Sequence, residues 1–563
     1  MRILLLASAF NSLSQRLYAE LRDRRHTVDI RLAGDDDELR TSVSRLRPDL
    51  VLAPMLRTAI PRDVWSELTC LIVHPGPPGD RGPSSLDRAI QDGLAEWGVT
   101  VLQAEAEMDA GPIWAWAPCR LPERGKSDLY RNEVADAAVA AALLAVERVT
   151  SGSYAPQPQH GPGWRETVRT RPFLRQEERR IDWAGDSTEA VLRRLRAADS
   201  QPGVLGALCG DEWYLHGGYR EPVLRGRPGE LLATRAGAVC RATSDGAVWI
   251  PELRRRRAPG GPATFKLPAV TALGALLPPV PEVAAPLMPG GQAGPAWSDI
   301  RYREDGPVGF LRFSFPGGAM STDHCRRLRE AYRCALARPT SVLVLGGGRD
   351  FFSNGIHLNV IEAAPDRAAE SWANITAMDD LVAEVLTTTD RLVVAAVAGN
   401  AAAGGVMLAL AADEVWCRGG SVLNPHYRLM GLYGSEYWTY TLPRRVGAAE
   451  AERLTRQALP VSAAAAERIG LVDRVLDCGP QEFGPSAARL AGLLAASPAA
   501  QRRIAAKKAA READERAKPL AEYREEELAV MHRQFFTPES PYHALRSAFV
   551  RKRPAPAGSV ARM

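Results

Sequence analysis

The sequence lacks the features that define several large classes of protein. No apolar run reaches the roughly 18–20 residues that a membrane-spanning helix needs. The eight cysteines are scattered without a Cys-x-x-Cys pair, as in cytosolic proteins whose thiols stay reduced, and the chain shows no spacing typical of metal ligands. The N-terminal apolar run Ile3–Ala7 is short and is followed at once by polar sequence, which favours a strand over a signal peptide. We therefore expect a cytoplasmic protein without a membrane span or a metal site.

An excess of charge of one sign is also missing. Lys and Arg total 71 against 66 acidic residues, and a net charge of +5 spread over 563 residues does not indicate nucleic-acid binding. With 46% hydrophobic and 24% charged residues, the composition is that of an ordinary globular protein and excludes wholesale disorder. The length exceeds what one hydrophobic core supports, so we expect about three or four domains.

The first part of the chain alternates predicted strands and helices, as in an α/β fold. Short apolar runs, at Ile3–Ala7, Asp49–Met55 and Cys70–Gly76, alternate with stretches of helical periodicity. Strands that alternate with helices predict an open, Rossmann-like sheet. A Gly- and Pro-rich connector, Ser151–Trp164, follows, so we place the first domain at residues 1–160.

The composition and periodicity of the sequence change twice more. Short alternating strands with Gly turns predict a small, OB-like β-barrel over residues 165–270. Residues 271–297 are dense in Pro, Gly and Ala without periodicity, which is typical of a linker. From 298 to 563, apolar strands precede long helices with charges of both signs, which predicts a second α/β domain with solvated helices at its C-terminus.

The first candidate site lies where an apolar strand ends on His74. In an open parallel sheet, ligands bind beyond the carboxyl ends of the strands. The following loop, PGPPGDRGPSS, is expected to keep its backbone open and its N–H groups free, which suits a loop that lies over a flat ligand. Asp109 lies in a tight turn after the next strand, and a carboxylate can orient an imidazole that carries a proton in acyl transfer. By residue type alone, a strand-end histidine bonded to backbone and a turn-forming aspartate are more common.

These residues resemble the pattern of the folate-dependent formyltransferases, such as methionyl-tRNA formyltransferase. That pattern is Asn-x-His-Pro, a loop ending in Arg-Gly, and then Ala-Ile, Gly-Val-Thr and Asp-x-Gly. The matching positions here are His74-Pro75, Arg81-Gly82, Ala89-Ile90, Gly98-Val99-Thr100 and Asp109-Ala110-Gly111. The family's catalytic Asn falls on Ile72, so the resemblance implies that another group stabilises the tetrahedral intermediate. Ile181–Trp183 and Arg193–Gly203 resemble the small barrel that accompanies these formyltransferases.

Two segments that lead from a strand into glycines, Val344–Glu362 and Ala396–Trp416, mark the second candidate site. A helix that starts close to Gly404 presents free N–H groups as an oxyanion site, although glycines before a helix more often mark close packing. Together the segments resemble the crotonase (enoyl-CoA hydratase/isomerase) superfamily, whose paired backbone N–H groups polarise an acyl-CoA thioester. The resemblance assigns these two donors to the amides of Ile356 and Gly404.

The residues of hydration chemistry are replaced in this chain. The two glutamates that enoyl-CoA hydratases use fall on Met407 and about His426, so addition of water to an enoyl-CoA is not expected. The segment Leu423–Gly447 is dense in Tyr and Gly around a single acid, Glu436. Tyr427 and Glu436 beside a desolvated thioester could serve as proton donor and acceptor. Composition alone favours an aromatic packing loop equally.

A formyltransferase half followed by a crotonase half resembles one family closely, the hydrogenase maturation factors HypX and HoxX. The strings that carry this resemblance span almost the whole chain and are HPGxxGDRGPSSLDRAI, RRIDW, GAVWI, FKLPA, NPHYRxxGLYGSEYWTYTLPRRVG and FFxxxxxYHxLRxAFVxK. The resemblance implies transfer of a formyl group from 10-formyl-tetrahydrofolate to coenzyme A (CoA), with His74 and Asp109. It also implies release of carbon monoxide from formyl-CoA, with Tyr427 and Glu436. The carbon monoxide would become a ligand of NiFe hydrogenase, with the hydrogenase maturation machinery as partner.

Contacts to folate and CoA are predicted at a few more positions. These are Gln15, Arg81, Ser84, Ser85, Arg131 and, in the closing segment FVRKRPA, Lys552. Capping and surface ion pairing account equally well for each of them by residue type. Two other functions stay open at this point. One is a formyltransferase for another acceptor, such as an amino sugar, with an inactive crotonase domain, and the other is a non-catalytic maturation scaffold.

Overall fold

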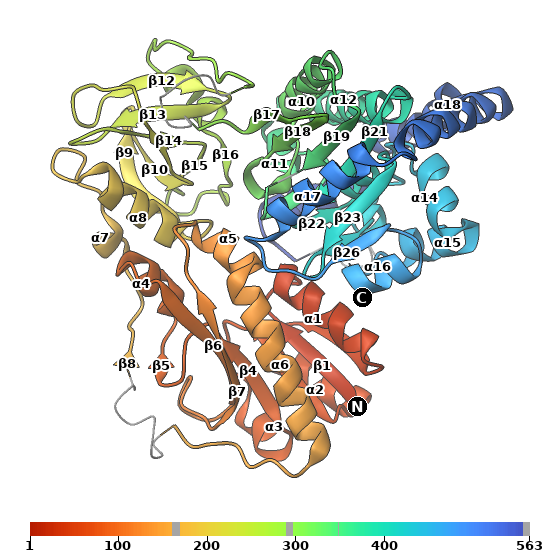
Figure 1. Ribbon diagram of the computed structural model, residues 1–563. Helices are drawn as coiled ribbons and strands as arrows, with labels where there is room; N and C mark the ends of the chain where they lie inside the picture. The colour runs from red at the N-terminus through yellow and green to blue at the C-terminus, as the bar shows by residue number, and fades with distance from the viewer. Residues whose placement is uncertain (160–168, 289–296, 347, 555–563) are drawn as a thin grey trace.

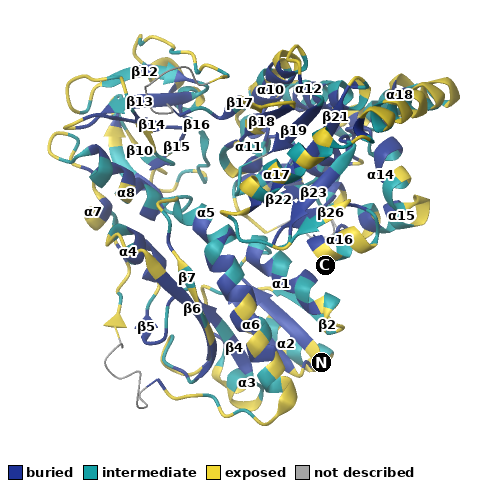
Figure 2. Ribbon diagram, in the orientation of Figure 1, coloured by how far each residue is buried: buried dark blue, intermediate teal, exposed yellow. Residues whose placement is uncertain are grey.

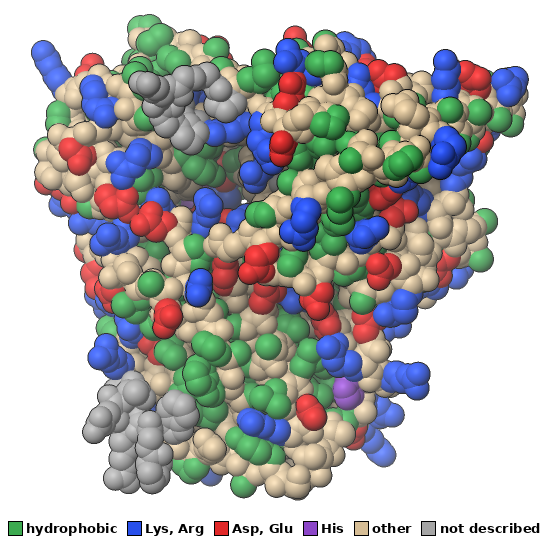
Figure 3. Space-filling model, viewed as in Figure 1, with side chains coloured by type: hydrophobic (Ala, Val, Ile, Leu, Met, Phe, Trp, Pro, Cys, Tyr) green, Lys and Arg blue, Asp and Glu red, His purple; other side chains and the backbone are tan. Residues whose placement is uncertain are grey.

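A computed structural model describes residues 1–159, 169–288, 297–346 and 348–554. Figure 1 shows three bodies: an N-terminal α/β body, a body of short strands, and a second α/β body that carries the C-terminal helices. Acidic and basic side chains are mixed over the face shown in Figure 3, without a field of one sign. No helix in the described part of the chain is long and apolar enough to cross a membrane.

The N-terminal body is built on a six-stranded sheet in the order β2-β1-β3-β4-β6-β7. Its strands are β1 (Arg2–Ala7), β2 (Thr27–Leu32), β3 (Leu50–Met55), β4 (Cys70–His74), β6 (Glu96–Gln103) and β7 (Ile113–Arg120). The predicted α/β fold is confirmed, and the sheet is mixed, because β6 pairs antiparallel with both β4 and β7. The connection between β6 and β7, residues 104–112, is too short for the crossover that a parallel pair requires.

Helices cover both faces of this sheet. The remaining elements of the body are α1 (Ser12–Asp23), α2 (Asp36–Leu46), α3 (Arg62–Glu67), β5 (Asp80–Arg81), α4 (Ser85–Gln91), α5 (Lys126–Arg131), α6 (Glu133–Ser151) and β8 (Arg169–Thr170). The Asn11 side chain caps α1 by accepting from the Ser14 N–H, and Leu13, Leu17 and Leu21 bury one face of the helix. α1 and the alanine-rich α6 share one core, while α2 and α3 pack on the other face.

The second body consists of two four-stranded antiparallel sheets, ordered β16-β15-β10-β9 and β11-β14-β13-β12. Its elements are α7 (Gln176–Arg179), α8 (Thr188–Ala198), β9 (Val204–Leu208), β10 (Asp211–His216), β11 (Tyr219–Glu221), β12 (Leu231–Arg235), β13 (Ala238–Ala242), β14 (Ala247–Ile250), β15 (Glu252–Arg255), β16 (Leu267–Pro268), α9 (Ala269–Leu273) and the 3-10 turn η2 (Gly274–Leu276). α8 closes the core with Val191, Leu192 and Leu195. The predicted body of short strands is therefore present.

The segment predicted as a linker is attached to this second body where the structure describes it. The Thr234 N–H donates to the Pro281 carbonyl at 2.9 Å, and the Val283 N–H donates to the Thr234 carbonyl at 2.9 Å. Trp297 is buried beside Trp249, with 6.1 Å between the ring centroids. Residues 289–296 lie outside the described part of the chain. The domain boundaries stay predictions.

The second α/β body has a six-stranded sheet, β17-β18-β19-β21-β23-β26, and a smaller sheet, β20-β22-β24-β25. Its strands are β17 (Ile300–Asp305), β18 (Val308–Phe313), β19 (Val342–Gly346), β20 (Phe351–Ser353), β21 (Leu392–Val397), β22 (Asn400–Ala402), β23 (Glu414–Arg418), β24 (Val422–Asn424), β25 (Val461–Ser462) and β26 (Arg474–Leu476). β18, β19, β21, β23 and β26 pair in parallel. β19 and β21, in the middle of the sheet, are apolar and buried along their whole length, as expected for parallel strands covered on both faces.

The helices of this body pack on both faces of its larger sheet. They are η3 (Pro316–Gly318), α10 (Thr322–Leu336), α11 (Leu358–Ala363), α12 (Arg367–Thr387), α13 (Gly404–Leu410), η4 (Tyr427–Met430), α14 (Trp438–Val446), α15 (Ala448–Gln457), α16 (Ala463–Arg468), α17 (Phe483–Ala496), α18 (Ala500–Ala517), α19 (Leu520–Phe536) and α20 (Pro541–Val550). α18 is mostly exposed, as predicted (Figure 2). The same prediction is wrong for α19, which buries Glu527, Met531 and Phe535 against α12 and α14.

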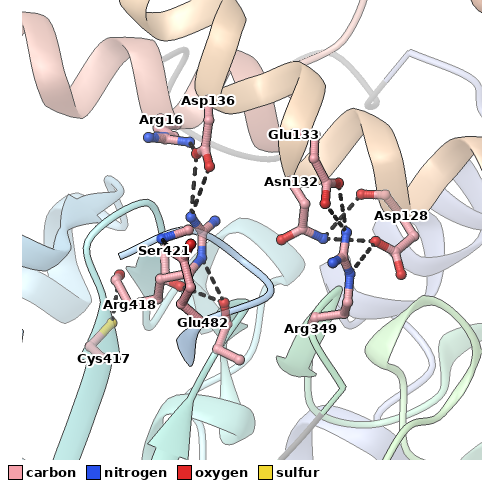
Figure 4. A network of polar contacts seen from close by, with 12 residues as sticks. Arg16, Asp128, Asn132, Glu133, Asp136, Arg349, Cys417, Arg418, Ser421 and Glu482 are labelled. Carbon is pink, nitrogen blue, oxygen red and sulfur yellow. Dashed lines mark hydrogen bonds and ion pairs between the residues drawn. The ribbon is translucent and has the colours of Figure 1, made fainter. Parts of the chain in front are cut away.

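Ion pairs join the N-terminal body to the second α/β body (Figure 4). Arg349, just before β20, donates to Asp128 at 2.8 Å and to the two oxygens of Glu133 at 2.8 and 2.6 Å. Arg418, at the end of β23, lies 3.2 Å from Asp136 of α6. Because both arginines are largely buried, these pairs act as fixed contacts rather than as loose surface pairs. The Arg349 contacts hold the loop before β20 against α5 and α6, and the Arg418 contact holds the end of β23 against α6.

Candidate active sites

His74, the last residue of β4, lies between two carboxylates. Its Nδ1 is 3.4 Å from Asp109 Oδ2, and its Nε2 is 3.2 Å from Asp80 Oδ2. The imidazole is only 4% exposed. The predicted pair of His74 and Asp109 therefore comes together, and an imidazole with a carboxylate at each nitrogen can take up a proton and pass it on.

Asp109 reaches His74 through the loop between β6 and β7, not through the end of a strand. β6 runs antiparallel to β4, and its last residue, Gln103, pairs at the end of β4 away from His74. Asp109 has a φ of 56°, and its carbonyl oxygen accepts from the Gln159 side-chain amide at 2.8 Å. Its Oδ2 also accepts from the Gly82 N–H at 3.1 Å. These contacts fix the carboxylate against the imidazole.

Asp80 is a residue of this site that was not predicted. A Cβ on Gly76 would lie 2.5 Å from His74 Nε2 and 2.6 Å from Asp80 Oδ2, so glycine is needed for the loop to close over their contact. The other Asp80 oxygen accepts from Arg171 Nε at 2.7 Å. The available signal was that Asp80 is the only acid in PGPPGDRGPSS.

The loop after His74 is more structured than predicted. The Gly76 N–H donates to the His74 carbonyl at 2.9 Å, and the Asp80 N–H donates to the Pro77 carbonyl at 3.0 Å. The loop also pairs with the chain through β5 and β8. The expectation of free N–H groups is therefore wrong at Gly76, Asp80 and Gly82. The tight turns that Pro and Gly favour bring these N–H groups to nearby acceptors.

The two serines predicted to meet a cofactor make protein contacts. Ser84 Oγ accepts from the Leu174 N–H at 2.9 Å, and Ser85 Oγ donates to the Pro75 carbonyl at 3.0 Å. Both side chains are buried. They join the loop to the chain that leads into the second body and to the strand end that carries His74.

Ile72 and Arg81 are close to His74 in the sequence, but one has an apolar side chain and the other a charged one. Ile72, on the same side of β4 as His74, is half-buried among the apolar residues under α2 and α3. It supplies no donor for an oxyanion. Arg81 is buried and donates from Nη1 to Glu107 Oε1 at 2.8 Å, so an ion pair lies in the loop after His74.

The second candidate site forms where two glycine turns meet. Gly404 opens α13, so its N–H is one of the first in that helix and has no acceptor within it. A Cβ on Gly355 would lie 3.2 Å from the Gly404 nitrogen, which places the turn before Ile356 directly against this amide. The structure therefore brings the two predicted donors, the amides of Ile356 and Gly404, into one place.

Tyr427 and Glu436 also meet at this place. The Tyr427 hydroxyl donates to Glu436 Oε2 at 2.8 Å, and both side chains are buried. Burial and the Asp379 carboxylate raise the pKa of Glu436 to about 8. Burial and the neighbouring Glu436 raise the pKa of Tyr427 well above its usual value. Near neutral pH the pair therefore holds protons that can move across one hydrogen bond.

Replacing Gly404 by alanine is expected to destabilise the fold, because the new Cβ would lie 2.0 Å from Glu436 Oε1. Pushing a buried side chain aside costs about 1–3 kcal/mol, which a lower midpoint of thermal unfolding measures. Gly492→Ala is the matched control, since nothing lies within 4 Å of that Cβ in α17. It should leave the midpoint unchanged or raise it slightly. Equal midpoints for the two variants would contradict the close approach of Glu436 to Gly404.

The positions of the two hydratase glutamates carry no acid. Met407 is fully buried in α13. His426 has its Nδ1 3.0 Å from the Asn424 carbonyl oxygen, and burial lowers the pKa of His426. A thioether and a neutral imidazole held by backbone do not provide the pair of carboxylates that water addition uses.

Two further buried acids were not predicted. Asp379 of α12 and Glu527 of α19 are fully buried beside the segment that carries Glu436. Burial raises the pKa of each to about 7. In the sequence both stand in stretches of helical periodicity among other charged residues, where an acid usually faces solvent. The sequence therefore held no signal that these two differ from their neighbours.

Three predicted cofactor contacts remain, at Gln15, Arg131 and Lys552. Gln15 is on α1 and donates to the Phe10 carbonyl at 3.0 Å. Arg131 pairs with Asp350 and lies over the Phe351 ring, 4.5 Å from its centroid. Lys552 follows α20 with a φ of 53°. Their roles toward a cofactor stay predictions.

Comparisons with known proteins match the order of these bodies. The formyl transferase family matches residues 31–146, the formyl transferase C-terminal domain matches 174–262, and enoyl-CoA hydratase/isomerase matches 326–557. The hydrogenase maturation factor HoxX of Bradyrhizobium diazoefficiens is 49% identical over 555 residues, which cover 98% of this chain and 95% of that protein. The chain belongs to the HypX/HoxX family of hydrogenase maturation factors. The predicted resemblance to this family is thereby confirmed.

A solved structure of a HypX/HoxX protein shares the whole fold. The crystal structure of HypX from Aquifex aeolicus in complex with tetrahydrofolic acid is 43% identical, with a TM-score of 0.94, and covers 98% of this chain and 96% of that chain. Methionyl-tRNA formyltransferase of Thermus thermophilus is 33% identical over 180 residues, which are 32% of this chain and 53% of that protein. Formyltransferase and crotonase-like parts are thus joined here as in other HypX/HoxX proteins.

Proposed function

We propose that this member of the HypX/HoxX family transfers a formyl group from 10-formyl-tetrahydrofolate to CoA and then releases carbon monoxide from the formyl-CoA. The observation that carries the proposal is the buried Tyr427–Glu436 hydrogen bond beside the Gly404 amide, in a crotonase-like body that lacks the hydratase glutamates. The carbon monoxide would serve NiFe hydrogenase maturation in the cytoplasm, and the maturation machinery would receive it.

In the first step, His74 moves one proton. It accepts the proton of the CoA thiol as sulfur attacks the formyl carbon, and it returns that proton to the folate nitrogen as the C–N bond breaks. Asp109, 3.4 Å from Nδ1, fixes the ring and stabilises the imidazolium form. The products are formyl-CoA and tetrahydrofolate, so atoms and charge balance.

In the second step, the C–H and C–S bonds of the formyl thioester break and an S–H bond forms. The amides of Ile356 and Gly404 hold the thioester oxygen, where negative charge develops. Tyr427 and Glu436 take the formyl proton and return a proton to sulfur, which yields carbon monoxide and CoA. The buried position of both side chains excludes water, which would otherwise hydrolyse the thioester.

A cluster of positive charge supports binding of CoA, whose phosphates are anionic. Burial and the charges of Lys266, Arg57 and Arg254 lower the pKa of Lys552. Burial together with Lys266, Arg254 and Lys552 holds the pKa of His216 well below its ordinary value. These residues come from all three bodies, so the positive potential gathers where the bodies meet. An anion placed there would relieve this repulsion.

Folate binding is supported from the first site and from a relative. The Aquifex aeolicus HypX structure contains tetrahydrofolic acid. The pair of His74 and Asp109 lies at the end of β4 in this chain, beside the loop predicted to cover a flat ligand. Gln15, Arg81, Ser84, Ser85 and Arg131 are proposed to line the folate and CoA sites.

The direct test supplies the purified full-length chain with 10-formyl-tetrahydrofolate and CoA and traps the gas phase with deoxyhaemoglobin. We expect the spectrum of carbonmonoxy-haemoglobin to appear only when both substrates are present. Formyl-CoA without gas would instead support a formyltransferase with an inactive crotonase domain, as would a formyl group transferred only to an amino sugar. Neither product from a folded preparation would support the scaffold function.

A further inference from the structure

The segment that presents Glu436 is anchored by a carboxylate from a different helix. Asp379 of α12 accepts the Glu436 N–H at 2.8 Å through Oδ1. The Ser435 hydroxyl lies 2.9 and 2.8 Å from the two Asp379 oxygens. Asp379 is fully buried, so these contacts form in a region of low dielectric, where hydrogen bonds to a charged acceptor are strongest.

The anchored segment needs this support because its backbone is strained. Glu436 and Tyr437 both lie in the left-handed region, with φ values of 62° and 59°. Such conformations cost about 1–3 kcal/mol each for residues other than glycine and persist only where surrounding contacts enforce them. A second acid, Glu527 of α19, accepts the N–H groups of Tyr437 at 2.9 Å and Thr439 at 2.8 Å from the other side.

The direction of the Glu436 side chain follows from this conformation. Its Oε2 accepts from Tyr427, while its Oε1 lies where a Cβ on Gly404 would come within 2.0 Å. An extended or right-handed backbone at Glu436 would turn the carboxyl group away from both neighbours. The anchor on the main chain therefore decides whether the acid faces the helix end.

We propose that Asp379 is a positioning residue of the second site: its buried carboxylate holds the Ser435–Glu436 turn in the left-handed conformation and so presents the Glu436 carboxyl group to Tyr427 and Gly404. This inference rests on the proposed function, because it assigns a role in the chemistry of that site. Asp379 itself touches no reacting atom in this arrangement and acts through Glu436.

The charges around Glu436 add a second effect of Asp379. The titratable and charged groups around Glu436 and Asp379 include Asp380 of α12, Arg524 and Glu527 of α19, Tyr427 of η4, Tyr437 at the start of α14 and Cys325 of α10. Burial is the largest cause that raises the pKa of Glu436, and Asp379 is the next. The bond from Tyr427 lowers that pKa. Arg524 Nε, 3.9 Å from Asp379 Oδ2, offsets the charge of Asp379 only in part.

Asp379→Asn separates the support of the Ser435–Glu436 turn from the effect of the Asp379 charge on the pKa of Glu436. The amide keeps an oxygen acceptor for the turn but carries no charge. The ionised form of Glu436 then loses a repulsive neighbour, so the pKa of Glu436 falls. The rate of carbon monoxide formation is measured against pH, with formyl-CoA as the added substrate. We expect the limb of this pH profile near pH 8 to move by about 1 unit or more toward lower pH. Glu384→Gln is the matched control: it removes another charge of α12, one that pairs with Arg329 and Arg333 of α10, and should leave the limb in place.

An infrared titration gives a readout that does not depend on activity. The protonated Glu436 carboxyl should give a C=O band near neutral pH that is absent in Glu436→Gln. In Asp379→Asn that band should disappear at lower pH than in the wild type. If neither the pH-profile limb nor the pH at which the C=O band disappears changes in Asp379→Asn, the proposed role of Asp379 is wrong. If the wild type releases no carbon monoxide from formyl-CoA, the proposed function fails, and the infrared comparison still decides the inference.

A second variant covers the case in which Asp379→Asn does not fold. Ser435→Ala removes one hydrogen bond to Asp379 and leaves every buried charge unchanged. We expect carbon monoxide formation to slow by about tenfold, the effect of losing one hydrogen bond to a charged group, while formyl-CoA forms at the wild-type rate. An unchanged rate of carbon monoxide formation in a folded Ser435→Ala protein would overturn the anchoring role.

Discussion

Replacing His74 by alanine is expected to lower formyl-CoA formation by about 10²- to 10⁴-fold, the usual contribution of a general acid–base residue, and to stop carbon monoxide release with it. The imidazole at the end of β4 has a carboxylate 3.4 Å from Nδ1 and another 3.2 Å from Nε2. Without this imidazole, His74→Ala has no side chain that carries the proton from the thiol to the folate nitrogen. Chromatographic quantification of formyl-CoA, with deoxyhaemoglobin as gas trap, measures both losses.

Two further variants sharpen the test of His74. Asp109→Asn keeps the shape of the partner but offers an amide to Nδ1, so the ring is no longer held as an imidazolium, and we expect a large but smaller loss than for alanine. His26→Ala removes a half-buried histidine near the N-terminus and should leave both products unchanged. Supplying formyl-CoA to the His74→Ala protein should restore carbon monoxide release. Failure to restore it would mean that His74 acts on the second site or on folding.

Replacing Tyr427 by phenylalanine is expected to give the opposite pattern. Carbon monoxide release should fall by about 10²- to 10⁴-fold while formyl-CoA accumulates, because only the proton transfer of the second step is lost. Removing the hydroxyl deletes the hydrogen bond to Glu436 Oε2 and leaves the ring packing intact. Simultaneous measurement of formyl-CoA and trapped carbon monoxide separates this result from the loss of both products in His74→Ala.

Tyr440→Phe is the control for this second variant. Tyr440 lies in α14 of the same body, and its hydroxyl donates to Asp514 at 2.8 Å, outside the group around Glu436. Its loss should leave both products at wild-type amounts. If Tyr427→Phe releases carbon monoxide at the wild-type rate, Glu436 would need another proton partner, and the proposed second step would be wrong. If it loses formyl-CoA as well, the two sites are not chemically separate.

The residues of the candidate sites were predictable in part. Those placed by local sequence patterns were found, and those placed by tertiary packing were missed. His74, Gly404 and the α13 start were visible because strand ends and glycines before helices follow from local sequence patterns. Asp80 was not singled out, because its contact with His74 requires a loop closed at Gly76. Buried helical acids were missed for a stronger reason. Whether Asp379 faces solvent or the core depends on α19, which is far away in the chain.

The order of the three bodies, the apolar strands that form their sheets and the family of the chain could be predicted from the sequence, because they depend on local periodicity and on strings of neighbouring residues. Three further features follow only from how the elements pack: β6 runs antiparallel to β4, α19 buries one of its faces, and Tyr427 and Glu436 share a hydrogen bond. Such facts depend on which surfaces pack together. Packing brings distant residues into a shared low-dielectric interior, where the resulting contacts and pKa shifts arise.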